Sequence, residues 1–232
     1  MAGEMIKTEA TCLWIRPWSR TSHVTGWLTP SGTVSTVVKG AVRPKSFFLG
    51  QYDLNFTCEI LYYARAHGDL HALRECTPLE RRDFLRGDYR ALVTAERYRH
   101  LAGALAPAGP ESREWFEALG RGLAALAGAG PDGYLPQLLA FEKKVLALSG
   151  VWPEIPAKGG EIALSAGRTI PVPPATAAAL ADPDDEKNSE FLLDAARVVG
   201  VLYTTNLELP PDPRRAVLKL ICKPEQGQKE KT

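Results

Sequence analysis

Residues 28–46 read LTPSGTVSTVVKGAVRPKS, and this stretch decides the first half of the fold. Pro30, Ser31 and Gly32 supply turn chemistry, and the Val- and Thr-rich run that follows suits a pleated sheet. Gly40 and Pro44 then prevent a helix, and three cations, Lys39, Arg43 and Lys45, follow within seven residues. A basic loop at a sheet edge is suited to contacting phosphates, and a solvated surface loop is the ordinary alternative.

Residues 1–77 are predicted to form a small closed barrel. Gly, Pro, Ser or His-Gly-Asp breaks separate five apolar or β-branched runs, which are Thr11–Arg16, Ser22–Leu28, Thr33–Lys39, Tyr52–Tyr62 and Leu70–Cys76. Five strands in this length fit a small closed barrel, for which the OB-fold is the five-stranded candidate. Periodicity alone accommodates an SH3-like barrel nearly as well.

From Pro78 the apolar residues recur at helical spacing, so residues 78–222 are predicted to form an all-helical C-terminal domain. The helical segments are Leu79–Tyr98, Glu111–Ala127, Tyr134–Leu148, Ser189–Asn206 and Asp212–Ile221. The proline-containing residues 154–188 are expected to be an irregular connector with one short strand at Glu161–Leu164. The polar residues 223–232 are expected to be a disordered tail. The predicted fold class is therefore mixed α and β, in two parts.

Charge is distributed unevenly along the 232 residues, although the net charge is only +1. Residues 1–46 hold six Lys or Arg and two Glu, so they carry +4 and the remainder carries −3. A basic N-terminal module on a mildly acidic remainder fits an anionic partner at one end. No run approaches the roughly 18 apolar residues of a membrane helix, and the cytoplasm is the expected location.

The sequence contains no motif that indicates an enzyme, and neither a catalytic residue nor a cofactor is predicted. The phosphate-binding, dinucleotide, zinc-protease and serine-hydrolase signatures are all missing. The four cysteines, at 12, 58, 76 and 222, are widely spaced and are expected to be reduced. His67 and His71 are four apart but flank Gly68-Asp69 in a predicted turn, so no metal site is predicted.

Two islands of sequence resemble bacterial RecO, the DNA repair and recombination mediator. The first runs through Arg16–Ser22, Leu28–Gly32, Val38–Ser46 and Gly50–Leu54, and the second is Phe141–Pro153, FEKKVLALSGVWP. The resemblance covers most of residues 5–153 and weakens beyond them. Many RecO-like proteins carry two cysteine pairs after the position of Trp152-Pro153, whereas this chain has no cysteine there before Cys222. A divergent member without the structural zinc is the expectation.

The resemblance implies a non-enzymatic mediator that binds single- and double-stranded DNA, anneals complementary strands and helps load RecA onto DNA coated with single-strand-binding protein. Its implied partners are RecR and the C-terminal tail of single-strand-binding protein, and its implied location is the nucleoid. A generic OB-fold protein that binds single-stranded DNA or RNA without recombination partners is the alternative. A scaffold that has lost DNA binding is a third interpretation.

The predicted DNA-binding residues combine cations with one exposed aromatic ring. They are Arg16, Trp18, Arg20, Lys39, Arg43 and Lys45. Trp14 and Trp27 are expected in the barrel core instead. A second basic set at residues 65–99, which includes Arg74, is expected to be mainly a salt-bridged helix face that extends the DNA path in part. Arg121, Lys143 and Lys144 are predicted at the rim of a groove for the tail peptide.

Overall fold

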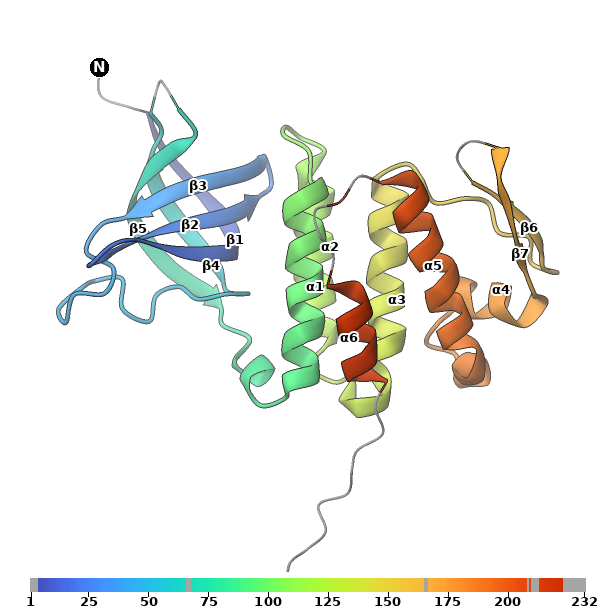
Figure 1. Cartoon of the computed structure of the whole chain (residues 1–232). Helices are drawn as coiled ribbons and strands as arrows, with labels where there is room; N and C mark the ends of the chain where they lie inside the picture. The colour runs from blue at the N-terminus through green and yellow to red at the C-terminus, as the bar shows by residue number, and fades with distance from the viewer. Residues whose placement is uncertain (1–3, 66–67, 165–166, 208, 210–212, 223–232) are drawn as a thin grey trace, which may run out of the picture.

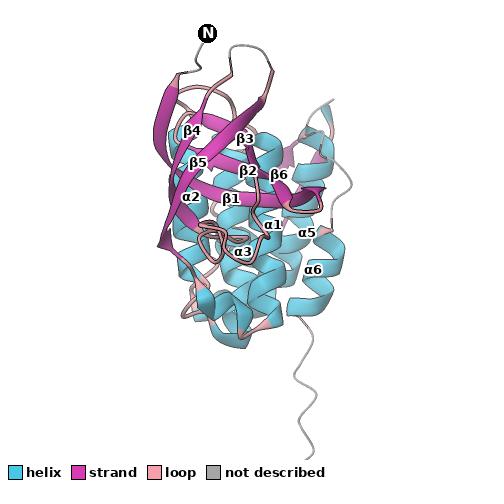
Figure 2. Cartoon of the chain, turned by 90° about the vertical axis from the view of Figure 1, so that its left-hand side faces the viewer, coloured by secondary structure: helices cyan, strands magenta, loops and turns pink. Residues whose placement is uncertain are grey.

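The computed structural model describes residues 4–65, 68–164, 167–207, 209 and 213–222. A β-barrel lies at one end of the molecule, and layers of helices follow it toward the other end (Figure 1). Seen along the long direction of the molecule, the barrel covers the end of the helical part (Figure 2). The predicted order of a barrel followed by helices is confirmed.

The barrel is closed and five-stranded, in the order β1-β2-β3-β5-β4. Its strands are β1 Met5–Ser19, β2 Ser22–Thr29, β3 Gly32–Val38, β4 Thr57–Tyr63 and β5 Leu70–Glu80. All neighbouring strands are antiparallel except the parallel pair β3 and β5. This five-stranded closure is OB-fold-like. The long β1 makes it possible, because its first half pairs with β4 and its second half pairs with β2.

The barrel interior is apolar and encloses three of the cysteines. Trp27 is fully buried, and its indole N–H donates to Thr36 Oγ1 at 2.9 Å, so its prediction as a core residue is confirmed. Cys12, Cys58 and Cys76 are buried as free thiols. Burial raises the pKa of Cys12. The pKa of Cys76 is raised first by a hydrogen bond with Cys58 and second by burial. Protonated, enclosed thiols are poor nucleophiles.

Each predicted helical segment contains a helix, but the first begins later than expected. β5 extends to Glu80, and the α-helix predicted over Leu79–Tyr98 begins only at Tyr89. The principal helices are α1 Tyr89–Leu105, α2 Ser112–Ala125, α3 Gly130–Leu148, α5 Leu192–Asn206 and α6 Arg214–Ile221. Short 3-10 helices lie at Asp83–Arg86 and Glu186–Phe191. None of the described helices combines the length and apolar character that a bilayer crossing requires.

The expected irregular connector at 154–188 is more ordered than the sequence indicated. It contains a two-stranded antiparallel sheet of β6 Gly160–Ala163 and β7 Thr169–Val172, followed by α4 Pro174–Ala181. The short strand expected at Glu161–Leu164 corresponds to β6. Pro174 lies in the first turn of α4, where a proline starts a helix instead of breaking it. The alanines that follow are strong helix formers. The predicted tail at 223–232 lies outside the described residues.

Polar contacts and a shared apolar core attach the barrel to the helices. Leu13 and Leu28 belong to the helical core cluster, although they come from β1 and β2. The Arg99 guanidinium of α1 donates to the Leu13 carbonyl, and Ser112 Oγ of α2 donates to the Thr29 carbonyl at 3.0 Å. These contacts fix one side of the barrel against α1 and α2. The loop from β3 to β4 runs along the lower left of the barrel, away from these helices (Figure 1).

Candidate nucleic-acid interface

A hollow of about 410 Å³ opens where the turn between β1 and β2 meets the end of β3. Three of the predicted DNA-binding residues, Trp18, Lys39 and Arg43, line it together with Ser19, Ser22, Val37 and Gly40. The antiparallel pairing of β2 with β3 places His23 opposite Val38, which brings Lys39 next to the β1–β2 turn. The face of strands 2 and 3 and the loop between strands 1 and 2 are where OB-folds commonly bind oligonucleotides.

Backbone hydrogen bonds hold the loop after β3 against the β1–β2 turn. The Gly40 N–H donates to Ser22 Oγ at 3.2 Å, and the Val42 N–H donates to the Thr21 carbonyl at 3.2 Å. Gly40 has φ +69°, a left-handed conformation that favours glycine. A Cβ on Gly40 would stand 3.3 Å from Arg43 Cδ, so the Arg43 side chain folds across this glycine. The loop therefore presents its cations from a tethered backbone.

The predicted cations of the barrel stand in solvent, without acidic partners in the part of the chain that the structure describes. Arg16, Arg20, Lys39, Arg43 and Lys45 are all exposed. Within the described residues, none of the five forms an ion pair. Their charges are consequently available to neutralise an anionic ligand.

The remaining predicted residues do not line the hollow. Arg20 occupies the β1–β2 turn, and Lys45 lies farther along the β3–β4 loop. The Arg16 guanidinium lies 4.8 Å from the centre of the Trp14 ring, and Trp14 packs directly over Gly26. Trp14 is half-buried, whereas Trp18 is 62% exposed. Trp18 is thus the tryptophan that a ligand can reach, as the sequence predicted.

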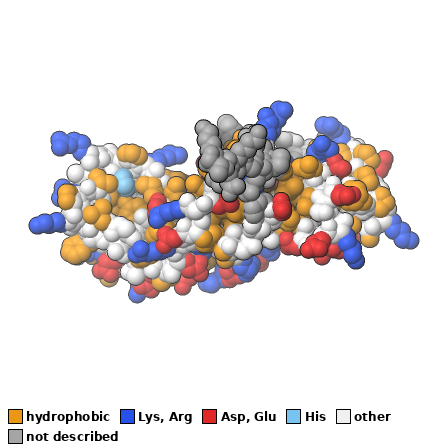
Figure 3. Space-filling model, turned by 90° about the horizontal axis from the view of Figure 1, so that it is seen from below, with side chains coloured by type: hydrophobic (Ala, Val, Ile, Leu, Met, Phe, Trp, Pro, Cys, Tyr) orange, Lys and Arg blue, Asp and Glu red, His pale blue; other side chains and the backbone are white. Residues whose placement is uncertain are grey.

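Positive and apolar groups alternate on this end of the molecule. Figure 3 shows Lys and Arg side chains projecting from the barrel end, with hydrophobic side chains exposed between them. Phe47, on the β3–β4 loop, is 94% exposed, and the sequence analysis missed it. The signal was present in the sequence, because Phe47 and Phe48 directly follow Lys45-Ser46 in the predicted basic loop.

A groove of about 310 Å³ lies between α2 and α3, where two of the three residues predicted at the rim of a peptide groove meet. Arg121 and Lys144 stand at its rim, and Ala118, Gly122, Ala125, Gln137, Ala140 and Phe141 complete its lining. Small side chains on α2 create the hollow, since a Cβ on Gly122 would lie 2.7 Å from the Phe141 ring. Both rim cations have acidic neighbours, Arg121 with Glu117 at 3.4 Å and Lys144 with Glu114 at 3.8 Å.

Lys143 lies apart from the other two predicted rim residues. Its Nζ donates to the Ala181 carbonyl at 2.8 Å and lies 5.7 Å from the centre of the Trp152 ring. It lines a separate, mainly apolar hollow of about 520 Å³, which lies between α4 and the segment that follows α3. Adjacent positions on a helix point in different directions, so Lys143 and Lys144 do not share one groove.

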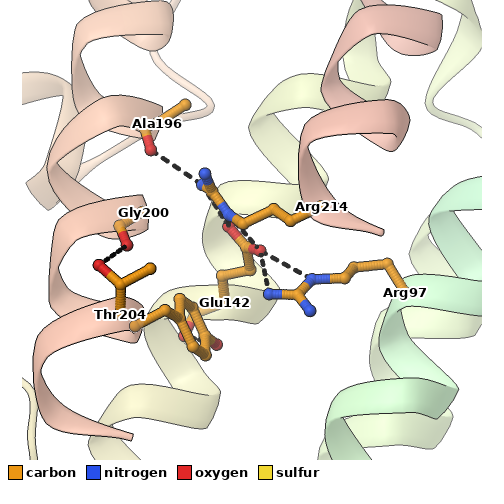
Figure 4. A network of polar contacts seen from close by, with 7 residues as sticks. Arg97, Glu142, Ala196, Gly200, Thr204 and Arg214 are labelled. Carbon is orange, nitrogen blue, oxygen red and sulfur yellow. Dashed lines mark hydrogen bonds and ion pairs between the residues drawn. The ribbon is translucent and has the colours of Figure 1, made fainter. Parts of the chain in front are cut away.

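Part of the second basic set is buried inside the protein, whereas the set was expected to be mainly a salt-bridged helix face that extends the DNA path in part. Arg82 and Arg99 are buried at the junction with the barrel. Arg97 of α1 lies beside Glu142 of α3, with Arg97 Nη2 3.1 Å from Glu142 Oε1, and both side chains are fully buried. Arg214 of α6 donates to the same carboxylate from Nη2 at 2.8 Å and to the Ala196 carbonyl at 2.9 Å (Figure 4).

This buried network connects α1, α3, α5 and α6, and its enclosed charges serve packing instead of ligand binding. The spacing of its members, 45 and 72 residues from Glu142, explains why sequence inspection did not find it. The described residues contain no group of three or more His, Cys, Asp or Glu side chains that could hold a metal ion. His67 lies outside the described residues, and His71 stacks on Tyr62 with ring centres 5.4 Å apart.

Comparison of the sequence with models of protein families and with curated proteins returns no match.

Proposed function

We propose that this protein is a non-enzymatic nucleic-acid-binding mediator of the RecO type, which binds single- and double-stranded DNA through its barrel. The observation that carries the proposal is the hollow formed by Trp18, Lys39 and Arg43 on an OB-fold-like barrel. It joins an exposed ring with cations that have no acidic partner among the described residues. Phosphate neutralisation combined with base stacking is the usual chemistry of single-strand binding.

In this proposal the protein anneals complementary strands and helps load RecA onto DNA coated with single-strand-binding protein, with RecR as a partner. The task needs strands and partners held close together and no covalent step. The groove between α2 and α3 is the proposed seat of the tail of single-strand-binding protein, because an acidic, apolar peptide matches its apolar floor and the cations Arg121 and Lys144. Lys143 is left out of this seat because it lines another hollow.

The alternative is a single-strand DNA or RNA binder without recombination partners. The ion pairs of Arg121 and Lys144 favour it, since a peptide carboxylate would compete there with Glu117 and Glu114. Complex formation with RecR and with the tail peptide distinguishes the two functions. The mediator binds both, and the generic binder binds neither.

The test of DNA binding is a fluorescence titration of a labelled oligonucleotide over a salt series. The variant Lys39→Ala/Arg43→Ala/Lys45→Ala is expected to lose about tenfold or more in affinity at low salt and to lower the salt slope by about 2. The control Arg113→Ala/Lys158→Ala/Lys187→Ala removes the same charge from exposed positions in the helical part and should leave binding unchanged. Equal losses in both variants would remove the barrel loop from the interface.

A further inference from the structure

A second hollow, of about 470 Å³, lies on the barrel beside the β3–β4 loop. Phe47, Phe48, Arg74, Glu75, Cys76 and Thr77 line it. Phe47 is 94% exposed, whereas its neighbour Phe48 is partly buried against the barrel core. A phenyl ring so fully in water contributes nothing to the core, and its face is open to a flat aromatic ligand at the hollow.

The two hollows involve neighbouring strands of the barrel. β3 and β5 run parallel, and their pairing ends with Val37 opposite Ala72. Val37 of β3 lines the first hollow, and Arg74, two residues after Ala72 in β5, lines the second. Both hollows are therefore built on this pair of strands.

Each hollow combines one exposed aromatic ring with cations. The first has Trp18 with Lys39 and Arg43, and the second has Phe47 with Arg74. Arg74 is exposed and forms no ion pair with any described residue, although Glu75 also lines the hollow. Glu75 is exposed as well, so the lining carries one charge of each sign, and Lys45 precedes Phe47 by two residues on the loop.

We propose that the second hollow is a base-binding subsite for single-stranded nucleic acid, in which Phe47 stacks an unpaired base and Arg74 neutralises an adjacent phosphate. The inference rests on the proposed nucleic-acid binding, and it adds that this subsite binds the single-stranded form. Bases in a duplex are already stacked and paired, so their faces do not reach Phe47. The cations serve both forms of DNA, and Phe47 serves the single strand alone.

The test compares Phe47→Ala with the control Leu49→Ala, an apolar truncation in the same loop at a residue that is 50% exposed. Each full-length variant is titrated with a labelled oligo-dT and with a labelled mixed-sequence duplex of equal length. Phe47→Ala should weaken oligo-dT binding about 5- to 150-fold with an unchanged salt slope, and should leave duplex binding as it was. Phe47→Trp should retain the affinity, and Leu49→Ala should behave as the wild type.

Two results would overturn the subsite. One is an oligo-dT affinity of Phe47→Ala equal to that of the wild type, and the other is an equal loss for oligo-dT and duplex. Failure of the proposed function looks different, because the wild-type protein itself would then bind neither probe. In that case the subsite falls together with the proposed function.

Discussion

In the barrel, Lys39, Arg43 and Lys45 stand in solvent, and none has an acidic partner among the described residues. In the helical part, Arg97 and Arg214 approach one carboxylate, Glu142, which is fully buried. Both regions contain clusters of positive side chains, one within a single loop and the other assembled from α1 and α6. The two clusters differ in the source of the negative charge that neutralises them. Glu142 supplies it in the helical part, whereas in the barrel it is left for a ligand to supply.

The difference separates the charges that stabilise the fold from those that can bind a ligand. A buried cation needs a partner inside the protein, because water no longer solvates it. An exposed cation contributes little to the free energy of unfolding and retains its capacity to neutralise a phosphate. Substitutions in the two clusters should consequently affect different measurements.

The largest effect is expected from Glu142→Gln. The change leaves the guanidinium groups of Arg97 and Arg214 facing a neutral amide in a site without solvent. Removal of one partner from a buried ion pair costs about 3–5 kcal/mol, and urea unfolding followed by the helical circular dichroism signal measures it. Glu117→Gln is the control, since Glu117 pairs with Arg121 on the surface and should change stability by less than about 0.5 kcal/mol. Similar costs for both variants would contradict the assigned difference between the clusters.

A smaller effect, of opposite sign in the two regions, is expected from adding one methyl group to a glycine. A Cβ on Gly26 in β2 would lie 2.1 Å from Trp14 Cε2, so Trp14 and the Arg16 guanidinium above it must move. Gly26→Ala should destabilise the protein by about 1–3 kcal/mol. Gly120→Ala in α2 meets no atom within 4 Å and should stabilise by about 0.5–1 kcal/mol. Thermal unfolding of both variants checks the signs, and destabilisation by Gly120→Ala would show that α2 is packed more tightly than described.

The helical part should also show a pH dependence that the cation loop lacks. Burial, together with a 2.9 Å hydrogen bond from Tyr134 Oη to Asp88 Oδ2, raises the pKa of Tyr134 to about 12. An unfolded tyrosine has a pKa near 10, so the folded state retains its proton over a higher pH range. The stability that this group contributes is present below about pH 10 and is lost as the pH rises through about 12.

Tyr134→Phe removes this hydrogen bond and should cost about 1 kcal/mol at neutral pH. It should also make the decline of the unfolding free energy between pH 10 and 12 shallower than in the wild type. Tyr89→Phe is the matched control, because Tyr89 is 63% exposed and should alter neither value. If the unfolding free energy of Tyr134→Phe declined between pH 10 and 12 as steeply as that of the wild type, Tyr134 would not be the source of this pH dependence.

The sequence predicted those features that depend on residues close together in the chain. Alternating strands and turn residues indicated the barrel, and the 3.6-residue period indicated the principal helices. Trp18, Lys39 and Arg43 were identified one by one from local composition, whereas their meeting in one hollow depends on the register of β2 against β3. Local propensity was misleading where proline was taken as a breaker, at the start of α4. It also misplaced two boundaries, because β4 begins at Thr57 instead of Tyr52 and β5 continues to Glu80 instead of giving way to a helix at Leu79.

The features that sequence inspection missed depend on distant contacts. Arg97, Glu142 and Arg214 become a network only when α1, α3 and α6 pack together, and nothing in their local sequence distinguishes a buried arginine from a solvated one. Lys143 and Lys144 are neighbours in sequence, and the helix turns them toward different hollows. Phe47 has a typical core side chain, and only its position on the loop reveals its exposure.

The smallest effect on stability is expected where the effect on binding is largest. Lys39→Ala/Arg43→Ala/Lys45→Ala removes three exposed side chains that form no ion pair among the described residues. Its free energy of unfolding should therefore stay within about 0.5 kcal/mol of the wild type, as measured by urea denaturation without DNA. Added oligonucleotide should raise the stability of the wild type more than that of the variant, because a ligand stabilises only the state that binds it. A variant that is several kcal/mol less stable without DNA would mean that the loop cations support the barrel, as Arg97 and Arg214 support the helices.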